Sequence, residues 1–196
     1  MRVIRRNRRL LGVGAALALL LAMTLGGTSA TAHGDKDGAR AVVRDRNGQR
    51  VAAITLFTTG PGKVTVHVRA RRLPPGFHGF HVHAVGVCDP ATGFTSAGGH
   101  FNPTGDPHGD HAGDLPVLLV NADGTAQATV VTDRFTIDQL LDADGSAMVV
   151  HAAADNYANI PTRYHSHDAN VYGPDPVTLS AGDSGDRIAC GRVRRL

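Results

Sequence analysis

Histidines are concentrated in one stretch of the chain, Gly76 to Asp114, which holds six of the 11 histidines. Within it, His81 and His83 flank a single residue. A β-strand would point both imidazoles to one face, roughly 6.6 Å apart, and two ligands of one metal ion can use that spacing. The same H-x-H pattern is also typical of two solvent-exposed histidines on an alternating strand. The residues that follow decide between these interpretations.

Four further potential ligands follow in a segment rich in Gly, Pro and Asn: His100, His108, His111 and Asp114. Such a segment predicts a loop, and this loop must fold back toward the strand for its side chains to contribute to a metal site. The last three residues are spaced by three, so one helical turn or one tight loop would bring them to one side. Imidazole suits copper, and a carboxylate together with histidines suits tetrahedral zinc. The pattern therefore favours a metal site.

The first 32 residues have the features of a secretory signal peptide. Five arginines precede an apolar run from Leu10 to about Leu25, and Ala30 and Ala32 complete an A-x-A cleavage pattern. We expect residues 33–38 to form a flexible tail and residues 39–196 a single domain. The chain would be secreted, to the extracellular space or the periplasm, without stable membrane association after cleavage. Arg8 and Arg9 keep both general and twin-arginine export open.

Removal of the leader changes the charge balance. Of the 20 Lys and Arg residues, 15 remain against 17 acidic ones, which gives a net charge of −2. This balance argues against a nucleic-acid partner. Two cysteines, Cys88 and Cys190, would lie in an exported chain where disulfides persist, so we expect them to be bonded. Closing that loop would be worth roughly 4.7 kcal/mol in the chain-entropy model.

The remainder of the chain predicts short strands. Turn signals at 47–48, 59–62 and 123–124 predict three hairpins, which join 40–44 to 51–57, 51–57 to 64–70, and 116–120 to 126–132. Further strands are expected at 80–84, 146–151 and 187–193. Segment 135–141 is either a helical turn or a bent strand, and 155–185 is a long loop of the kind that carries function. About eight strands and two long loops favour an all-β antiparallel sandwich or flattened barrel.

Five separate motifs then carry a resemblance: GFHGFHVH, SAGGHFNP, HGDHAGD, MVVHAAADN and GDRIACG. In identity and order they resemble those of the secreted copper/zinc superoxide dismutases. The resemblance implies an eight-stranded Greek-key barrel of immunoglobulin-like sandwich type. It also implies two metal ions that share His100, copper held by His81, His83, His100 and His151, and zinc held by His100, His108, His111 and Asp114.

The resemblance further implies roles around the metals. Asp155 would hold one ligand of each ion, His81 and His108, and Arg187 would receive the anion beside the copper. The implied reaction is dismutation of superoxide to dioxygen and hydrogen peroxide by a redox-cycling copper with a structural zinc. A homodimer is compatible with the family, although the charged end of the chain argues against an apolar C-terminal dimer patch. The alternative is an exported copper-binding domain of the same fold with little turnover.

Four other histidines carry no metal in this interpretation. His78 shares the parity of Phe80 and is expected to be a packed, hydrogen-bonded core residue. His67 falls on the polar face of its strand and is expected to face solvent. His165 and His167 repeat the H-x-H spacing inside the long loop, where we expect surface histidines rather than a metal-capturing pair.

Overall fold

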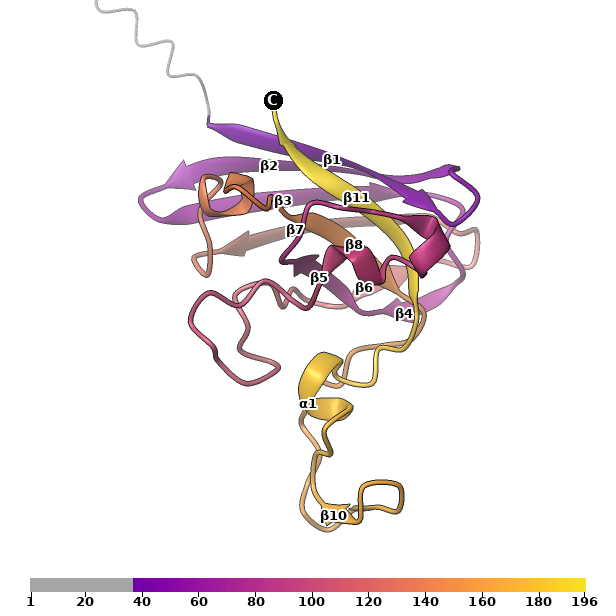
Figure 1. Cartoon of the computed structure of the whole chain (residues 1–196). Helices are drawn as coiled ribbons and strands as arrows, with labels where there is room; N and C mark the ends of the chain where they lie inside the picture. The colour runs from indigo at the N-terminus through magenta and orange to yellow at the C-terminus, as the bar shows by residue number, and fades with distance from the viewer. Residues whose placement is uncertain (1–36) are drawn as a thin grey trace, which may run out of the picture. The chain divides into compact units, whose positions relative to one another are not determined.

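The computed structural model describes residues 37–196. The predicted signal peptide and most of the predicted tail lie outside the described residues, and Gly38 already belongs to the first strand. Seven antiparallel strands form the main sheet (Figure 1), in the order β5 (Phe80–His83), β8 (Ala147–His151), β11 (Arg187–Arg195), β1 (Gly38–Asp45), β2 (Arg50–Gly60), β3 (Lys63–Ala70) and β7 (Ala126–Thr132). The last strand of the chain lies between β8 and β1, so the topology crosses over in the manner of a Greek key.

A second, short antiparallel sheet pairs β4 (Gly76–His78) with β6 (Leu118–Val120). Only Gly79 separates β4 from β5, so one extended segment contributes to both sheets. When β4 and β5 are counted as one strand, the sheets contain the eight strands predicted, and the all-β antiparallel fold class is confirmed.

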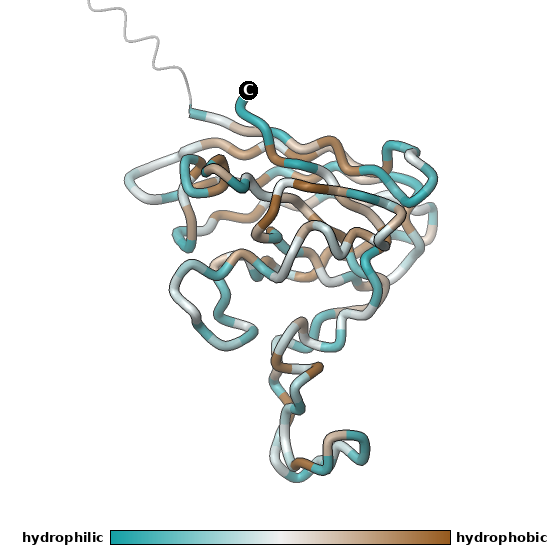
Figure 2. Tube along the Cα trace, in the orientation of Figure 1, coloured by the Kyte–Doolittle hydropathy of each residue, from teal (hydrophilic) through white to brown (hydrophobic). Residues whose placement is uncertain are grey.

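Alternation along the strands builds the core of the domain. In β1, the buried residues Ala39, Ala41 and Val43 alternate with exposed Arg40 and Val42. The apolar positions of the other strands point to the same interior, which Figure 2 shows as hydrophobic segments within the sheet and hydrophilic connections around it. The period of two in the sequence therefore places one set of side chains in the core and leaves the other on the outer face.

Two of the three predicted hairpins are present, because β1 pairs with β2 and β2 pairs with β3. The third prediction is wrong. Residues 123–124 do form a turn, in which Asn121 and Thr125 are hydrogen-bonded, but β6 pairs with β4 whereas β7 pairs with β3. The turn passes the chain from one sheet to the other, which a local turn signal cannot distinguish from a hairpin. Segment 135–141 contains a helical turn, η3 (Gln139–Leu141).

The connections carry the remaining short elements. Two 3-10 turns, η1 (Pro90–Thr92) and η2 (Thr95–Ala97), follow β5. The predicted disulfide joins Cys88 in that connection to Cys190 on β11, with their Cα atoms 5.6 Å apart. The long loop 155–185 contains a small hairpin of β9 (His165–Ser166) and β10 (Val171–Tyr172), then α1 (Thr178–Ala181). This loop projects from the barrel (Figure 1). Within residues 37–196, no helix has the length and apolar character needed to cross a bilayer.

Candidate metal centre

The candidate centre begins at β5, the edge strand of the main sheet. Residues after the 3-10 turns return along its free edge, so that His83 lies opposite His100 and His81 lies opposite Asp114. Main-chain hydrogen bonds hold this return, with Phe101 N donating to Val82 O at 2.8 Å and Val82 N to Gly113 O at 2.9 Å. A Cβ at Gly113 would lie 2.3 Å from Val82 O, so only glycine permits this approach.

The return covers the imidazoles on β5. They point away from the barrel core, as the alternation predicts, yet His81 and His83 are both fully buried, at 0 % exposure. Neither is a solvent-exposed strand histidine. His151, at the end of β8, completes the surroundings of these two rings together with His100. One nitrogen from each of the four histidines lies within 4.8 Å of the others, and we call His81, His83, His100 and His151 the four-histidine group.

Hydrogen bonds fix which nitrogen of each ring faces the middle of the four-histidine group. His83 donates from Nδ1 to Gly98 O at 2.9 Å, and His151 donates from Nδ1 to Gly185 O at 2.9 Å. Their Nε2 atoms, which then carry lone pairs, face each other at 3.3 Å. His81 Nδ1 and His100 Nε2 are buried without a hydrogen-bond partner. Such an arrangement of acceptors fits a cation, and all-imidazole ligation suits copper.

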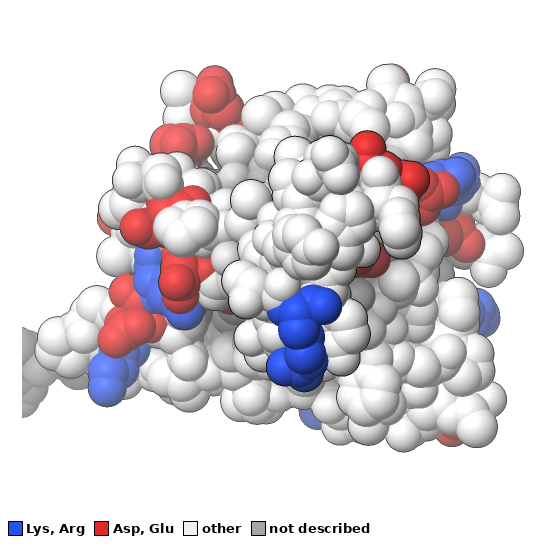
Figure 3. Space-filling model, turned by 90° about the horizontal axis from the view of Figure 1, so that it is seen from below, with Lys and Arg blue, Asp and Glu red and all other residues white. Residues whose placement is uncertain are grey.

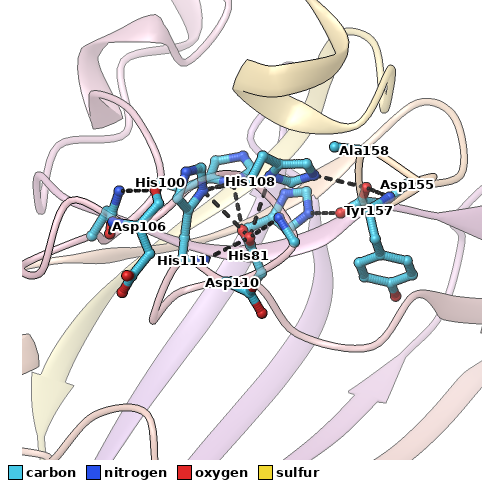
Figure 4. A network of polar contacts seen from close by, with 12 residues as sticks. His81, His100, Asp106, His108, Asp110, His111, Asp155, Tyr157 and Ala158 are labelled. Carbon is cyan, nitrogen blue, oxygen red and sulfur yellow. Dashed lines mark hydrogen bonds and ion pairs between the residues drawn. The ribbon is translucent and has the colours of Figure 1, made fainter. Parts of the chain in front are cut away.

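The second group, which we call the Asp114 group, consists of His100, His108, His111 and Asp114. Its three histidines are labelled in Figure 4. His111 Nδ1 lies 3.4 Å from the Nδ1 atoms of both His100 and His108. Asp114 Oδ2 lies 3.3 Å from Nδ1 of His108 and of His111, and Asp114 Oδ1 lies 2.7 Å from His100 Nδ1. A tetrahedron with metal–ligand bonds of about 2.0–2.1 Å has edges of about 3.3 Å. The donors therefore fit tetrahedral zinc.

A tight loop, not a helical turn, brings the Asp114 group together. Asp110 N bonds to Pro107 O and Asp114 N bonds to His111 O, which makes two successive turns. Asp114 Oδ2 also accepts hydrogen bonds from the backbone of Gly109 and His111. His100 belongs to both groups, since Nδ1 faces Asp114 and Nε2 faces the other histidines.

Asp155 connects the two groups through the ring nitrogens of His81 and His108 that point away from the candidate metal positions. Its Oδ2 accepts a hydrogen bond from His81 Nε2 at 2.7 Å, and its Oδ1 accepts one from His108 Nε2 at 2.9 Å (Figure 4). Tyr157 N donates to the same Oδ1 at 2.7 Å. The carboxylate sits against Gly182, where a Cβ would lie 1.7 Å from Oδ1. One carboxylate thereby orients a candidate ligand of each metal, as second-layer partners of metal ligands commonly do.

Burial sets the protonation of three members of the four-histidine group, His81, His83 and His151. It lowers the pKa of His81 to about 4, against the hydrogen bond to Asp155, and that of His151 to about 3, assisted by the neighbouring His81. Burial and the nearby His100 hold the pKa of His83 well below its usual range. These imidazoles are therefore neutral at pH 7 and present lone pairs to a metal without first losing a proton.

The Asp114 group has the opposite electrostatics. Burial opposes the charge on His108, but hydrogen bonds to Asp114 and Asp155 outweigh it and raise the pKa of His108 to about 9. Burial likewise opposes the charge on Asp114, yet hydrogen bonds from His100 and His108 hold the pKa of that carboxyl well below its usual range. Without metal this group holds a proton on His108, and a metal must displace it.

Arg187, at the start of β11, lies beside the four-histidine group. Its guanidinium donates to Phe94 O and to Gly98 O, both at 2.7 Å, and Gly98 O is also the acceptor of His83 Nδ1. It is half-buried and forms no ion pair with Asp186, whose carboxylate instead pairs with Arg46. Burial lowers the pKa of Arg187 from its ordinary value, although it stays cationic at neutral pH. Figure 3, viewed from below, shows that basic side chains are sparse on this side of the molecule and that some of them lie beside acidic ones.

The other histidines lie apart from both groups. His78 is buried and hydrogen-bonded to His151 O and Pro74 O, as expected of a core residue, and His67 is exposed. His165 and His167 contact each other on the long loop with ring centroids 5.1 Å apart. The sequence interpretation missed the orienting carbonyls of Gly98 and Gly185, which carry no sequence signal.

It also missed two residues that hold the loop of the Asp114 group. Arg134 donates to Gly109 O and His111 O, and Gly182 provides the space for Asp155. A glycine in the left-handed region just after α1, with φ of 58°, is the signal that could have indicated a close approach.

Fold and site together define a class: an antiparallel β-barrel protein with two adjacent groups of potential metal ligands that share one histidine. The sequence profile of "Copper/zinc superoxide dismutase (SODC)" matches residues 51–193. The chain therefore belongs to the copper/zinc superoxide dismutase family, for which copper and zinc are the metals that suit the two groups.

Individual relatives agree with this assignment. "Superoxide dismutase [Cu-Zn]" of Mycobacterium tuberculosis is 43% identical over 151 residues, which cover 72% of this chain and 59% of the relative. The protein of the same name from Escherichia coli K12 is 35% identical over 193 residues, covering 92% of this chain and 96% of the relative. The chain thus spans under two thirds of the mycobacterial relative and nearly all of the other.

Solved structures share the fold. An SOD-like protein from Bacillus subtilis superposes with a TM-score of 0.63 at 32% identity, covering 78% of this chain and 96% of that one. The clock protein EA4 superposes with a TM-score of 0.64 at 27% identity, covering 82% and 96%. Proteins that share this fold thus include ones whose names give no dismutase activity.

Proposed function

We propose that this protein dismutes superoxide: two superoxide anions and two protons give one dioxygen and one hydrogen peroxide. The observation that carries the proposal is His100, whose two nitrogens face the two donor groups. In this assignment His81, His83, His100 and His151 hold copper, and His100, His108, His111 and Asp114 hold zinc. Copper supplies a one-electron carrier that alternates between two oxidation states, and zinc supplies a fixed charge without redox chemistry.

The residues of the chain supply the remaining functions. His100 Nε2, buried and without a partner, is the atom that can hold and release a proton toward the copper side. Asp114 holds the His100 ring in place through its contact with Nδ1, the other ring nitrogen. Asp155 fixes the rings of His81 and His108. Arg187 offers a positive charge beside His83 and His151 to attract the anionic substrate.

Every candidate ligand comes from one chain, so the proposal needs no partner subunit to complete the site. We further propose that residues 1–32 are removed on export and that the domain beginning near residue 39 works outside the cytoplasm, as a defence against superoxide there. The disulfide between Cys88 and Cys190 supports this location, since such bonds persist in oxidising compartments.

Metal analysis together with a superoxide assay tests the proposal. The chain from His33 onward, prepared with both metals, is expected to hold one copper and one zinc and to remove superoxide at a rate proportional to its copper content. The alternative, a copper-buffering domain of the same fold, predicts full copper with no turnover. That second result would overturn the proposed activity while leaving the metal sites intact.

A further inference from the structure

The outer face of the main sheet carries exposed arginines that the proposed reaction does not use. They alternate with buried residues along the strands, so their side chains point away from the core. We call them the arginine face: Arg40 and Arg44 on β1, Arg50 on β2, Arg69 on β3, Arg71 directly after β3, and Arg194 on β11. None of them is a candidate metal ligand.

Some of these arginines lie directly opposite one another on neighbouring strands, and within the described part of the chain none of them forms an ion pair with an acidic side chain. Arg40 lies directly opposite Arg194 across the β1–β11 pair, and Arg44 lies opposite Arg50 across the β1–β2 pair. Like charges at opposite positions destabilise a sheet. Among residues 37–196, the arginines in ion pairs are Arg46, Arg134 and Arg195, and none belongs to the arginine face. An anion bound from solution would therefore reduce the repulsion between the arginines of this face.

A shallow hollow concentrates this charge. It is lined by Arg50, Arg69 and Arg71, together with small residues of β2 and β3. Ala53 lies opposite Arg69 in the β2–β3 pair, and its short side chain leaves space between the guanidinium groups. Guanidinium groups bind tetrahedral anionic groups through paired hydrogen bonds, so this hollow fits a sulfate or phosphate ester.

A second hollow adjoins the first, because Arg69 lines both. Its other polar side chains are the exposed His67, Gln127 and Thr129 and the half-buried Thr55, which come from β2, β3 and β7. Hydroxyl, amide and imidazole groups of this kind hydrogen-bond to sugar hydroxyls. Outward residues along β3 recur about every 6.6 Å, so Arg71, Arg69 and His67 form a track for an extended chain.

We propose that the arginine face binds an extended polysaccharide bearing sulfate or phosphate ester groups. The hollow of Arg50, Arg69 and Arg71 would take one ester group, and the adjoining hollow the neighbouring sugar. Neither hollow is lined by Trp, Tyr or Phe, the side chains on which single-stranded nucleic acids stack. Neither exposes a large apolar side chain that would enter a bilayer. Such binding would retain an exported enzyme on an anionic surface.

Binding to dextran sulfate tests the proposal. The wild-type protein is expected to bind it, and less tightly as salt increases, but not to bind neutral dextran. Arg69→Gln, at the position shared by both hollows, is expected to weaken binding about tenfold, and the triple variant Arg50→Gln/Arg69→Gln/Arg71→Gln about 100-fold or more. Arg163→Gln removes one equal charge from the long loop and is expected to leave binding unchanged.

Several outcomes would overturn the proposal. One is equal binding by the wild-type protein and the triple variant, and another is an equal loss in Arg69→Gln and Arg163→Gln. Binding of duplex DNA or phosphatidylglycerol vesicles as tight as that of dextran sulfate would reject the polysaccharide assignment. Thermal unfolding provides a measurement on the unaltered chain: dextran sulfate is expected to raise the unfolding temperature because it relieves the repulsion of the opposed arginines. Absence of that increase would also contradict the proposal.

Discussion

The two donor groups of this domain are held in different ways. His81, His83 and His151 of the four-histidine group lie on β5 and β8, which are paired in register from Phe80 opposite Val150 onward. The loop ligands of the Asp114 group, His108, His111 and Asp114, are held by two successive turns and by hydrogen bonds to Asp114. These ligands of the first group are therefore held by the strands of the barrel. The loop ligands of the second group are held by a loop whose backbone N–H groups bond to the Asp114 carboxylate.

Their charges differ as well. The strand ligands His81, His83 and His151 are neutral imidazoles. The loop-borne group instead contains an ionised Asp114 and a protonated His108 when metal is absent. The strand-borne histidines are suited to copper, whose charge changes between its two oxidation states. The loop that carries Asp114 is suited to zinc, whose charge stays constant and which would order the loop. We infer that the strands set the copper geometry and that zinc mainly completes the loop, with Asp155 and His100 as the two connections between them.

Replacement of a strand ligand should have the largest effect on activity. His83→Ala is expected to reduce superoxide removal by at least about 100-fold, because a copper ligand is lost while β5 keeps its pairing. Circular dichroism and thiol titration should still show a folded barrel with the disulfide intact. Near-native turnover with copper bound would refute the assignment of His83.

Gly182→Ala should disturb both groups at once. The added Cβ would overlap Asp155 Oδ1 and lie 2.6 Å from His108 Nε2, so the link from Asp155 to His81 and His108 would break. We expect loss of zinc and a decrease in activity of about tenfold to 100-fold, measured by metal analysis and assay.

Gly173→Ala is the matched control for this change. Gly173 lies on the same long loop and also has positive φ, at 83°, but a Cβ there would meet only Thr162, at 3.5 Å, and Ile160, at 3.6 Å. It should therefore show the backbone strain alone, about 1–3 kcal/mol, with both metals retained. Equal zinc loss in the two alanine variants would mean that strain, and not the position of Asp155, explains the effect.

Removal of the loop carboxylate should affect stability more than electron transfer. Asp114→Ala is expected to lower zinc content strongly, while copper reloading restores part of the activity. When zinc is present at about 1,000 times its Kd, its loss costs about 4 kcal/mol, or about 10 °C in the unfolding temperature. Calorimetry with and without zinc measures this difference. Wild-type protein that takes up copper but no zinc would contradict the assignment of Asp114.

The smallest effect is expected from the half-buried arginine. Arg187→Ala should reduce the second-order rate with superoxide by about tenfold at low salt and flatten its dependence on ionic strength, because one attracting charge is removed. Screening acts over about 8 Å at physiological salt, so the difference should shrink there. Arg187→Lys keeps the charge but loses the paired hydrogen bonds to Phe94 and Gly98, and should retain part of the salt dependence. A salt series identical to that of the wild type would exclude Arg187 from substrate attraction.

Local sequence patterns determined much of this protein. The alternation of residues in 80–83 places Phe80 and Val82 in the core and His81 and His83 on the other face, since side chains on a strand alternate by geometry alone. The spacing of His108, His111 and Asp114 similarly requires only a short turn. The motifs around these residues indicated the family, and the family match and the structural relatives agree with them.

Tertiary structure decided what depends on distant partners. The turn at 123–124 predicts a hairpin, but the strands on its two sides lie in different sheets, with β6 paired to β4 and β7 paired to β3. The hydrogen bond from His83 Nδ1 to Gly98 O decides which nitrogen of His83 faces the other histidines, and the bond from His151 Nδ1 to Gly185 O does the same for His151. The position of Asp155 depends on the space left by Gly182. Sequence spacing specifies which face of an element a side chain occupies. The direction of a hydrogen bond is set only when segments far apart in the chain are packed together.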